Sequence, residues 1–553
     1  MRFRFRLPGL PARGQPASGV LAPYRRFSPR WPLRILCAGL LLTAMIAWGM
    51  TYALTFPYLL VPLAVPAVAV AAMVIWALPE SSNPPVGGLS PLLFAFTAAM
   101  YLWPNYLAIA LPGLPWLTLL RILGVPMALL LLICVSTSTD FRKQLGGVLS
   151  TDALIWRLLV GFLAIQFLTI AFSPELGGSF ARFTITLTNW YAAFFVGCYV
   201  FSRPGAAARW VFLLWVCAVI LCFIAIWEAR LGRPPWAGYI PSFLRVDDPA
   251  VQRTLAGSAR GGLTARRVAA TTAHPLIFAE FLGLIVPFAV HYVMQNYALW
   301  LRVAAALSLP LIAYAIMLTD SRLGVGAELL SIVIYLFMWG ALRWARTRSS
   351  IFAPALVLAY PVIFSLFIVA TFAIGRLRAE VWGGGAAQPS TQARIDQWNS
   401  GLPKVFAAPW GHGIGRGGDV LGFVNGAGTL TIDTYYLNLL LEYGVLGFAV
   451  YACLFARGVW VSGRAGISSK ATDELLLLIP ISIALMNFII IKSVMASESN
   501  HPLVFMMLAA TLALTARVRA AEKEALAESG DREVKPPSRR RPRTAPAVRL
   551  NRR

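Results

Sequence analysis

The chain has 553 residues, of which 58% are hydrophobic and 13% are charged. Soluble domains carry about 25% charged residues, so this composition excludes a soluble globular protein, a disordered chain and a fibrous one. It indicates a polytopic membrane protein. We therefore expect an all-α fold of about 12–14 transmembrane helices joined by two large outer loops.

The net charge of +25 is concentrated in two tails. Residues 1–34 hold eight arginines and no acid, and residues 517–553 hold twelve Lys or Arg against five acids. Such charge is also seen in nucleic-acid-binding proteins, but neither tail shows a nucleic-acid-binding fold motif. Basic tails beside apolar spans indicate cytoplasmic flanks close to anionic lipid. We expect both termini in the cytoplasm and no nucleic acid as partner.

The apolar segments predict fourteen spans, since a helix needs about 20 apolar residues to cross the hydrocarbon. They lie near residues 35–56, 58–78, 90–111, 114–136, 152–172, 180–201, 209–228, 275–294, 298–318, 323–342, 352–375, 435–460, 474–493 and 500–517. With the N-terminus inside, Lys and Arg gather in the loops after even-numbered spans, as the positive-inside rule requires.

This topology divides the chain into seven parts. We expect a basic cytoplasmic tail (1–34), spans one to seven (35–228), an outer loop (229–274), spans eight to eleven (275–375), a second and larger outer loop (376–434), spans twelve to fourteen (435–517) and a disordered basic cytoplasmic tail (518–553). The loop 229–274 is rich in arginine, which is unusual on the outer side. An anionic ligand on that face would explain the placement.

Six cysteines all lie in apolar segments and form no CxxC pair, so we expect neither structural disulfides nor a cysteine zinc site. The polar residues that suggest chemistry gather instead at the outer ends of the spans. Arg266, Arg267 and His274 precede span eight, and Ser321-Arg322-Leu323-Gly324 follows span nine. The second loop contains Arg394, Trp398, a turn Pro409–Gly417 with His412 and Arg416, and then Asp433, Tyr435, Leu437, Glu442 and Gly444.

The order and spacing of these motifs resemble the O-antigen ligase and polysaccharide polymerase superfamily of bacterial envelopes. In that family a Ser-Arg-Gly element opens a helix. A large periplasmic loop then carries an Arg, a Trp four residues later, a Pro-x-Gly-x-Gly turn, and His-Asn-x-x-Leu followed by Glu-x-Gly. The resemblance covers about residues 260–460. Asp433 and Thr434 stand where ligases carry His and Asn, which favours a polymerase.

The resemblance implies a metal-independent, inverting glycosyltransferase of the bacterial inner membrane that uses no cofactor. It would polymerise undecaprenyl-diphosphate-linked repeat units into an exopolysaccharide or O-antigen at the periplasmic face. Its partners would be a lipid-linked donor, a glycan acceptor, the bilayer, and a chain-length regulator and flippase of the same pathway.

The resemblance also gives the arginines a task, because a guanidinium grips phosphate oxygens in a bidentate fork. We expect Arg267, Arg322 and Arg394 to clamp the donor diphosphate. Asp433 is the first candidate for the general base, and His274 and His412 are the next. The further candidates for substrate contacts are Arg266, Arg416, Trp398 and Tyr435.

Other interpretations stay open at this point. The same chemistry with a lipid A core or a protein as acceptor would make the chain a ligase. A transporter or flippase of lipid-linked sugars is the alternative from another class, although such proteins tend to show two matching halves. For single residues, Arg322 is also explained by snorkelling to water, and Asp433 by capping a helix, a role that can coexist with catalysis.

Overall fold

The computed structural model describes residues 84–110, 116–259, 266–346, 351–375, 388–424, 430–468 and 474–534, together with 39, 43, 69–71, 73–75, 77–81, 378 and 428. The expected tail 1–34, most of the spans 35–56 and 58–78, and the segment from 535 onward lie outside the described residues.

The protein is an all-α polytopic membrane protein with almost no sheet. In chain order the helices are α3 (Leu89–Leu102), α4 (Leu119–Thr137), α5 (Thr139–Leu149), α6 (Ala153–Thr169), α7 (Leu176–Thr186), α8 (Ala192–Phe201), α9 (Ala206–Leu231), α10 (Pro249–Ala256), α11 (Pro275–Met294), α12 (Leu299–Leu318), α13 (Arg322–Arg346), α14 (Phe352–Ala373), α16 (Gln388–Ala407), α17 (Gly417–Leu421), α18 (Tyr435–Gly466), α19 (Leu478–Lys492) and α20 (His501–Val534). A π-helical turn, Leu187–Tyr191, joins α7 to α8.

The strands are two short antiparallel pairs. Strand β1 (Ala108–Ile109) pairs with β2 (Leu117–Thr118), with Ala108 opposite Thr118. Strand β3 (Ser258–Ala259) pairs with β4 (Arg266–Arg267), with Ser258 opposite Arg267.

Among the described residues, eleven helices are long and apolar enough to cross a membrane, and they correspond to the fourth to fourteenth predicted spans. The third predicted span, 90–111, is only partly right. Its helix α3 ends at Leu102, and the next residue, Trp103, which precedes Pro104, has an extended backbone. A residue before proline disfavours helical backbone, which explains the early end.

The C-terminal boundary also differs from the prediction. Helix α20 continues through Val534, so residues 518–534 are helical rather than disordered. The run Ala520–Ala527 is made of strong helix formers, namely Ala, Glu, Lys and Leu, which favour continuation of the helix beyond its apolar part.

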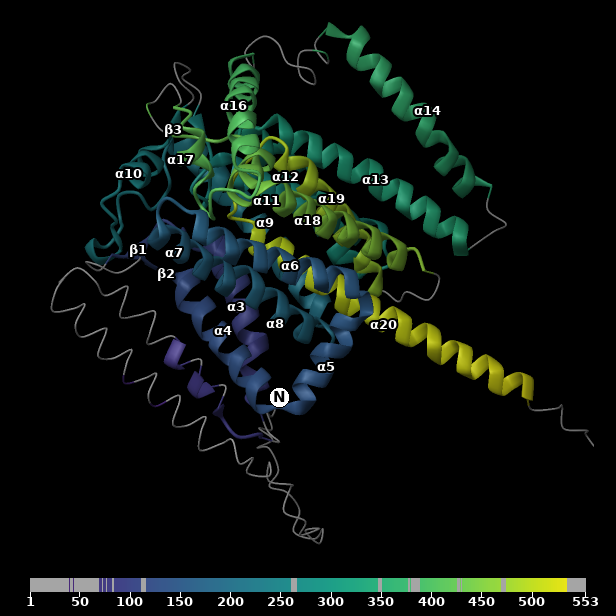
Figure 1. Ribbon diagram of the computed structural model, residues 1–553. Coiled ribbons are helices and arrows are strands. Elements are labelled where there is room, and N and C mark those ends of the chain that lie inside the picture. Colours follow the sequence, from purple (N-terminus) through teal and green to yellow (C-terminus); the bar gives the residue numbers. More distant parts are fainter. Residues whose placement is uncertain are drawn as a thin grey trace, which may run out of the picture. The chain divides into compact units, whose positions relative to one another are not determined.

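The chain forms two compact units, one of residues 1–84 with 132–139 and the other of residues 85–131 with 140–553. In the first unit, the Ser81 amide donates to the Thr137 carbonyl over 2.7 Å. In the second unit α11 is the most enclosed span, because α9, α12, α13 and α19 all pack against it. Helix α14 lies beside α13 and is exposed along most of its length (Figure 1).

Candidate functional site

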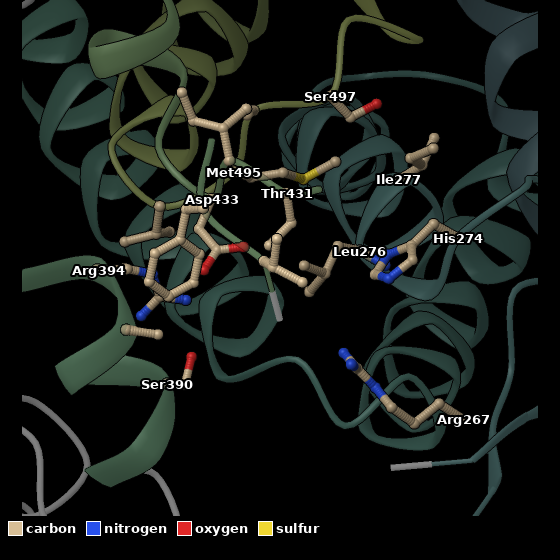
Figure 2. A pocket seen from close by; sticks show the side chains of 16 residues that line it. Arg267, His274, Leu276, Ile277, Ser390, Arg394, Thr431, Asp433, Met495 and Ser497 are labelled. Carbon is tan, nitrogen blue, oxygen red and sulfur yellow. The ribbon is translucent and has the colours of Figure 1, made fainter. Parts of the chain in front are cut away.

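A cavity of about 620 Å³ opens where several element ends of the second unit meet. Its walls come from the end of β4, the start of α11, the N-terminal part of α16, residues 423–424 and 431–433, and the segment that follows α19. The residues that line it are Arg267, His274, Leu276, Ile277, Ser390, Ala393, Arg394, Phe423, Val424, Thr431, Ile432, Asp433, Val494, Met495, Ala496 and Ser497. Figure 2 shows Arg394 and Asp433 on one side and Arg267 and His274 on another.

Arg267 is held by contacts from outside its own loop. The buried carboxylate of Glu228 on α9 accepts the amides of Ala269 and Ala270, at 3.1 Å and 2.7 Å. These bonds fix the chain directly after β4, where Ala270 has a left-handed backbone with φ of 50°. The Arg267 side chain then donates from Nε to the Thr319 carbonyl at the end of α12, over 2.8 Å. Arg267 is thereby fixed next to the Ser321–Gly324 motif.

His274 caps the start of α11 and lines the cavity. Its Nδ1 accepts the amide of Leu276 over 3.2 Å, so in the neutral ring the proton sits on Nε2. The protein around the ring, and after it the charge of Arg267, lower the pKa of His274 to about 4. The imidazole is therefore neutral near pH 7, with Nε2 as a hydrogen-bond donor. This state fits a ligand contact and does not fit a general base.

The opposite wall holds Arg394 and Asp433 together through Gln397. Gln397 is fully buried on α16. Its Nε2 donates to Asp433 Oδ2 over 3.1 Å, and its Oε1 accepts the Asp433 amide over 2.9 Å. Both the backbone and the carboxylate of Asp433 are therefore held by one side chain, which limits the directions in which the carboxylate can point.

Arg394 lies between opposite charges. Burial is the main cause that lowers the pKa of Arg394; the Asp433 carboxylate acts against it, and the charge of Arg322 acts with it. An arginine stays protonated under such a shift. Its Nε is buried and has no hydrogen-bond partner among the described residues. A buried donor without a partner is costly, and an anion in the cavity would supply one.

The Ser-Arg-Leu-Gly motif divides into structural and chemical parts. Ser321 Oγ accepts the Gly324 amide over 3.3 Å and so caps the start of α13. A Cβ at Gly324 would lie 2.7 Å from Ile316 Cγ2, which explains why α12 and α13 need glycine there. Arg322 is exposed at the helix start and lies outside the cavity lining, with its charge close enough to act on Arg394.

The Pro-x-Gly-x-Gly turn and the Glu-x-Gly motif lock together. Gly444 interrupts α18 with φ of 69° and ψ of −173°, which exposes the preceding carbonyls. The amides of His412 and Gly413 donate to the carbonyls of Leu441 and Glu442, over 2.9 Å and 3.1 Å. These two motifs therefore serve the structure: they fasten the end of the α16 segment to α18.

Four predicted substrate contacts lie outside the cavity lining. His412 Nδ1 is within 3.0 Å of the Leu441 carbonyl, and Arg416 pairs with Glu175 and Asp419. Trp398 packs against the buried cluster of Val405, Leu421, Leu437 and Leu441. Tyr435 is buried and donates its hydroxyl to Glu498 over 3.3 Å. Packing and internal bonds occupy these side chains.

Arg266, another predicted substrate contact, lies on strand β4, and its side chain is outside the part of the chain that the structure describes.

The structure also reveals residues that the sequence did not point to. Gln397 and Glu228 orient the site without any motif of their own. Glu280 and Lys492 form a fully buried ion pair. The sequence could have indicated Glu280 and Lys492, because a charged residue inside an apolar span is rare and marks function.

Residues 306–452 match the family model described as O-Antigen ligase. The matched range runs from α12 into α18 and contains Arg322, Arg394 and Asp433, while Arg267 and His274 precede it. No curated protein matches the chain.

Proposed function

We propose that the chain, whose residues 306–452 match the family model described as O-Antigen ligase, is an inverting glycosyltransferase that extends a polysaccharide. It transfers a growing glycan from undecaprenyl diphosphate to a second lipid-linked repeat unit, at the periplasmic face of the bacterial inner membrane. The observation that carries the proposal is the cavity in which Arg267 of β4 and Arg394 of α16, which are far apart in sequence, meet Asp433.

The arginines act on the leaving group. When the bond between the sugar C1 and the diphosphate oxygen breaks, negative charge builds on the diphosphate. Fixed cations stabilise that charge more in the transition state than in the ground state. Arg394 is suited to this task because its buried Nε has no partner among the described residues. Arg267 comes from the other wall. The positive charge of Arg322 also acts on Arg394.

Asp433 acts on the acceptor. Its carboxylate takes the proton of the acceptor hydroxyl while the oxygen forms the new bond to C1 and the diphosphate leaves from the opposite face. This single displacement inverts the anomeric centre. Gln397 orients the carboxylate by the two bonds described above. His274 contributes Nε2–H as a donor to a ligand oxygen, since its Nδ1 is already engaged by the Leu276 amide.

Ligation to a lipid A core or a protein is the second candidate, and the description of the matched family favours it. The two activities share the donor, the clamp and the base, and differ only in the acceptor. Asp433, in place of the histidine that ligases carry, supports polymerisation.

The test is a deletion strain complemented with Arg267→Ala, Arg394→Ala or Asp433→Asn, each at equal membrane abundance. Under the proposal the glycan stops at single repeat units on the acceptor, as read by gel electrophoresis. A ligase instead leaves free polymer and a bare acceptor. A flippase leaves lipid-linked repeat units on the cytoplasmic face.

The matched control is Arg253→Ala. Arg253 is exposed on α10 of the first arginine-rich loop, and its Nε donates to the Pro249 carbonyl of its own helix. We expect normal chain lengths from this variant. Normal chain lengths from Arg394→Ala as well would refute the clamp.

A further inference from the structure

A buried ion pair lies directly beside the cavity. Lys492 is the last residue of α19, and Glu280 lies in the second turn of α11. The Lys492 Nζ is 2.8 Å from Glu280 Oε1, and both side chains are 0% exposed. Both charges are therefore enclosed within the helix bundle and shielded from water and from lipid.

The pair is bonded to two cavity walls. Lys492 Nζ donates to the Ser497 carbonyl, and Ser497 lines the cavity. Asn500 Nδ2 donates to Glu280 Oε2 over 2.9 Å and to the carbonyl of Ile277 over 3.1 Å. Ile277 belongs to the wall at the start of α11. The ion pair therefore links the wall after α19 to the wall that carries His274.

The network also reaches the segment behind Arg267. The Tyr101 hydroxyl donates to Asn500 Oδ1 over 3.1 Å. The Tyr101 carbonyl accepts the hydroxyl of Thr271, which lies four residues after Arg267. One connected set of polar groups thus fixes three segments that border the cavity.

Stability alone does not account for this arrangement. Desolvation of two charges opposes their attraction, and well-packed apolar residues of similar size are often equally or more stable. Charges inside membrane spans are rare and tend to mark function. We propose that Lys492 and Glu280 are positioning residues of the transfer reaction: they hold the walls after α19 and at the start of α11 at the separation that the donor requires. This inference rests on the proposed function.

The experiment separates positioning from folding. In purified enzyme, Lys492→Met or Glu280→Gln alone leaves one buried charge unpaired, and we expect lower thermal stability and lower turnover. The double variant Glu280→Leu/Lys492→Met removes both charges, so thermal stability returns. Its kcat/KM for the donor stays at least about tenfold below wild type, because the Ser497 carbonyl has lost its donor and the wall shifts.

A double variant with wild-type stability and wild-type kcat/KM would overturn the inference. Should the Leu–Met double variant not fold, Glu280→Gln/Lys492→Met replaces it, because Gln keeps an acceptor for Asn500. For that variant too, a lowered kcat/KM at wild-type stability supports the inference, and a wild-type kcat/KM overturns it.

A matched control comes from a second ion pair at a distance from the cavity. Asp152 caps α6 and binds Arg457 of α18 over 2.8 Å. Asp152→Asn lowers thermal stability and leaves kcat/KM per folded molecule unchanged. A wild-type enzyme that transfers no glycan would defeat the proposed function instead. In that case the binding of undecaprenyl diphosphate alone tests the positioning role. We expect its affinity to fall about tenfold or more in the double variant, and an unchanged affinity would overturn the role.

Discussion

The link between Gln397 and Asp433 gives the sharpest test of the candidate base. Gln397→Leu keeps the approximate size of a fully buried side chain and removes both hydrogen bonds to Asp433. The charges of Arg394 and Asp433 stay in place. The variant therefore changes the orientation of the carboxylate without removing a chemical group from the cavity.

The magnitude follows from the two lost bonds. The bond to a carboxylate contributes about 1.5–3 kcal/mol, and a buried amide without its partner costs about 1–3 kcal/mol. We expect the free energy of unfolding to fall by about 2.5–6 kcal/mol. A base displaced by about 1 Å costs about 100-fold in rate. Because nothing then opposes its attraction to Arg394, the carboxylate turns toward the guanidinium and away from the acceptor.

The assay is turnover of purified lipid-linked repeat units per folded enzyme, with thermal unfolding measured in parallel. The control is Gln392→Leu, an exposed glutamine on the same helix whose side chain donates to Asp396. We expect its rate to stay within about twofold of wild type. Wild-type turnover in Gln397→Leu would refute the argument that orientation of Asp433 limits the reaction.

Three further outcomes follow from the geometry. Gly444→Ala places a Cβ 2.0 Å from the Pro409 carbonyl oxygen at a φ of 69°, so the unfolding temperature falls sharply, whereas Gly418→Ala, with no atom within 4 Å, leaves it unchanged. The pKa of His274 is about 4 in the fold and about 6.5 when unfolded, so the unfolded chain binds the extra proton between these values. Stability is lost as pH falls from 6.5 to 4, and His274→Gln flattens that slope in thermal unfolding. Excess EDTA leaves turnover unchanged, because arginine side chains, rather than a metal ion, stabilise the negative charge on the leaving diphosphate.

Much of the fold could be predicted from the sequence, because one physical requirement dominates it. A span must be apolar over a fixed length, and this rule located the eleven spans that the described residues contain. It failed where another rule prevailed: Pro104 ends α3 early, and strong helix formers extend α20 beyond its apolar part. Neither effect changes hydropathy enough for a span count to detect it.

The candidate site was predicted less well. Arginines that stand far apart in the chain were expected together, and Arg267 and Arg394 do line one cavity. His412 and Arg416 were also expected to contact substrate, but they lie outside the lining of this cavity and their side chains contact other residues of the protein. The sequence shows which residue types are present, but not which of them are already satisfied by neighbours. Gln397 illustrates the converse, since only the fold brings it to Asp433.

The attachment of Arg267 has a consequence for the loop before it. The Glu228 carboxylate fixes the main chain two and three residues after Arg267, and the end of α12 holds the Arg267 side chain, so neither of these contacts comes from the stretch 232–256. A change in the length or sequence of residues 232–256 would therefore leave the contacts of Glu228 and of the end of α12 that hold Arg267 in place.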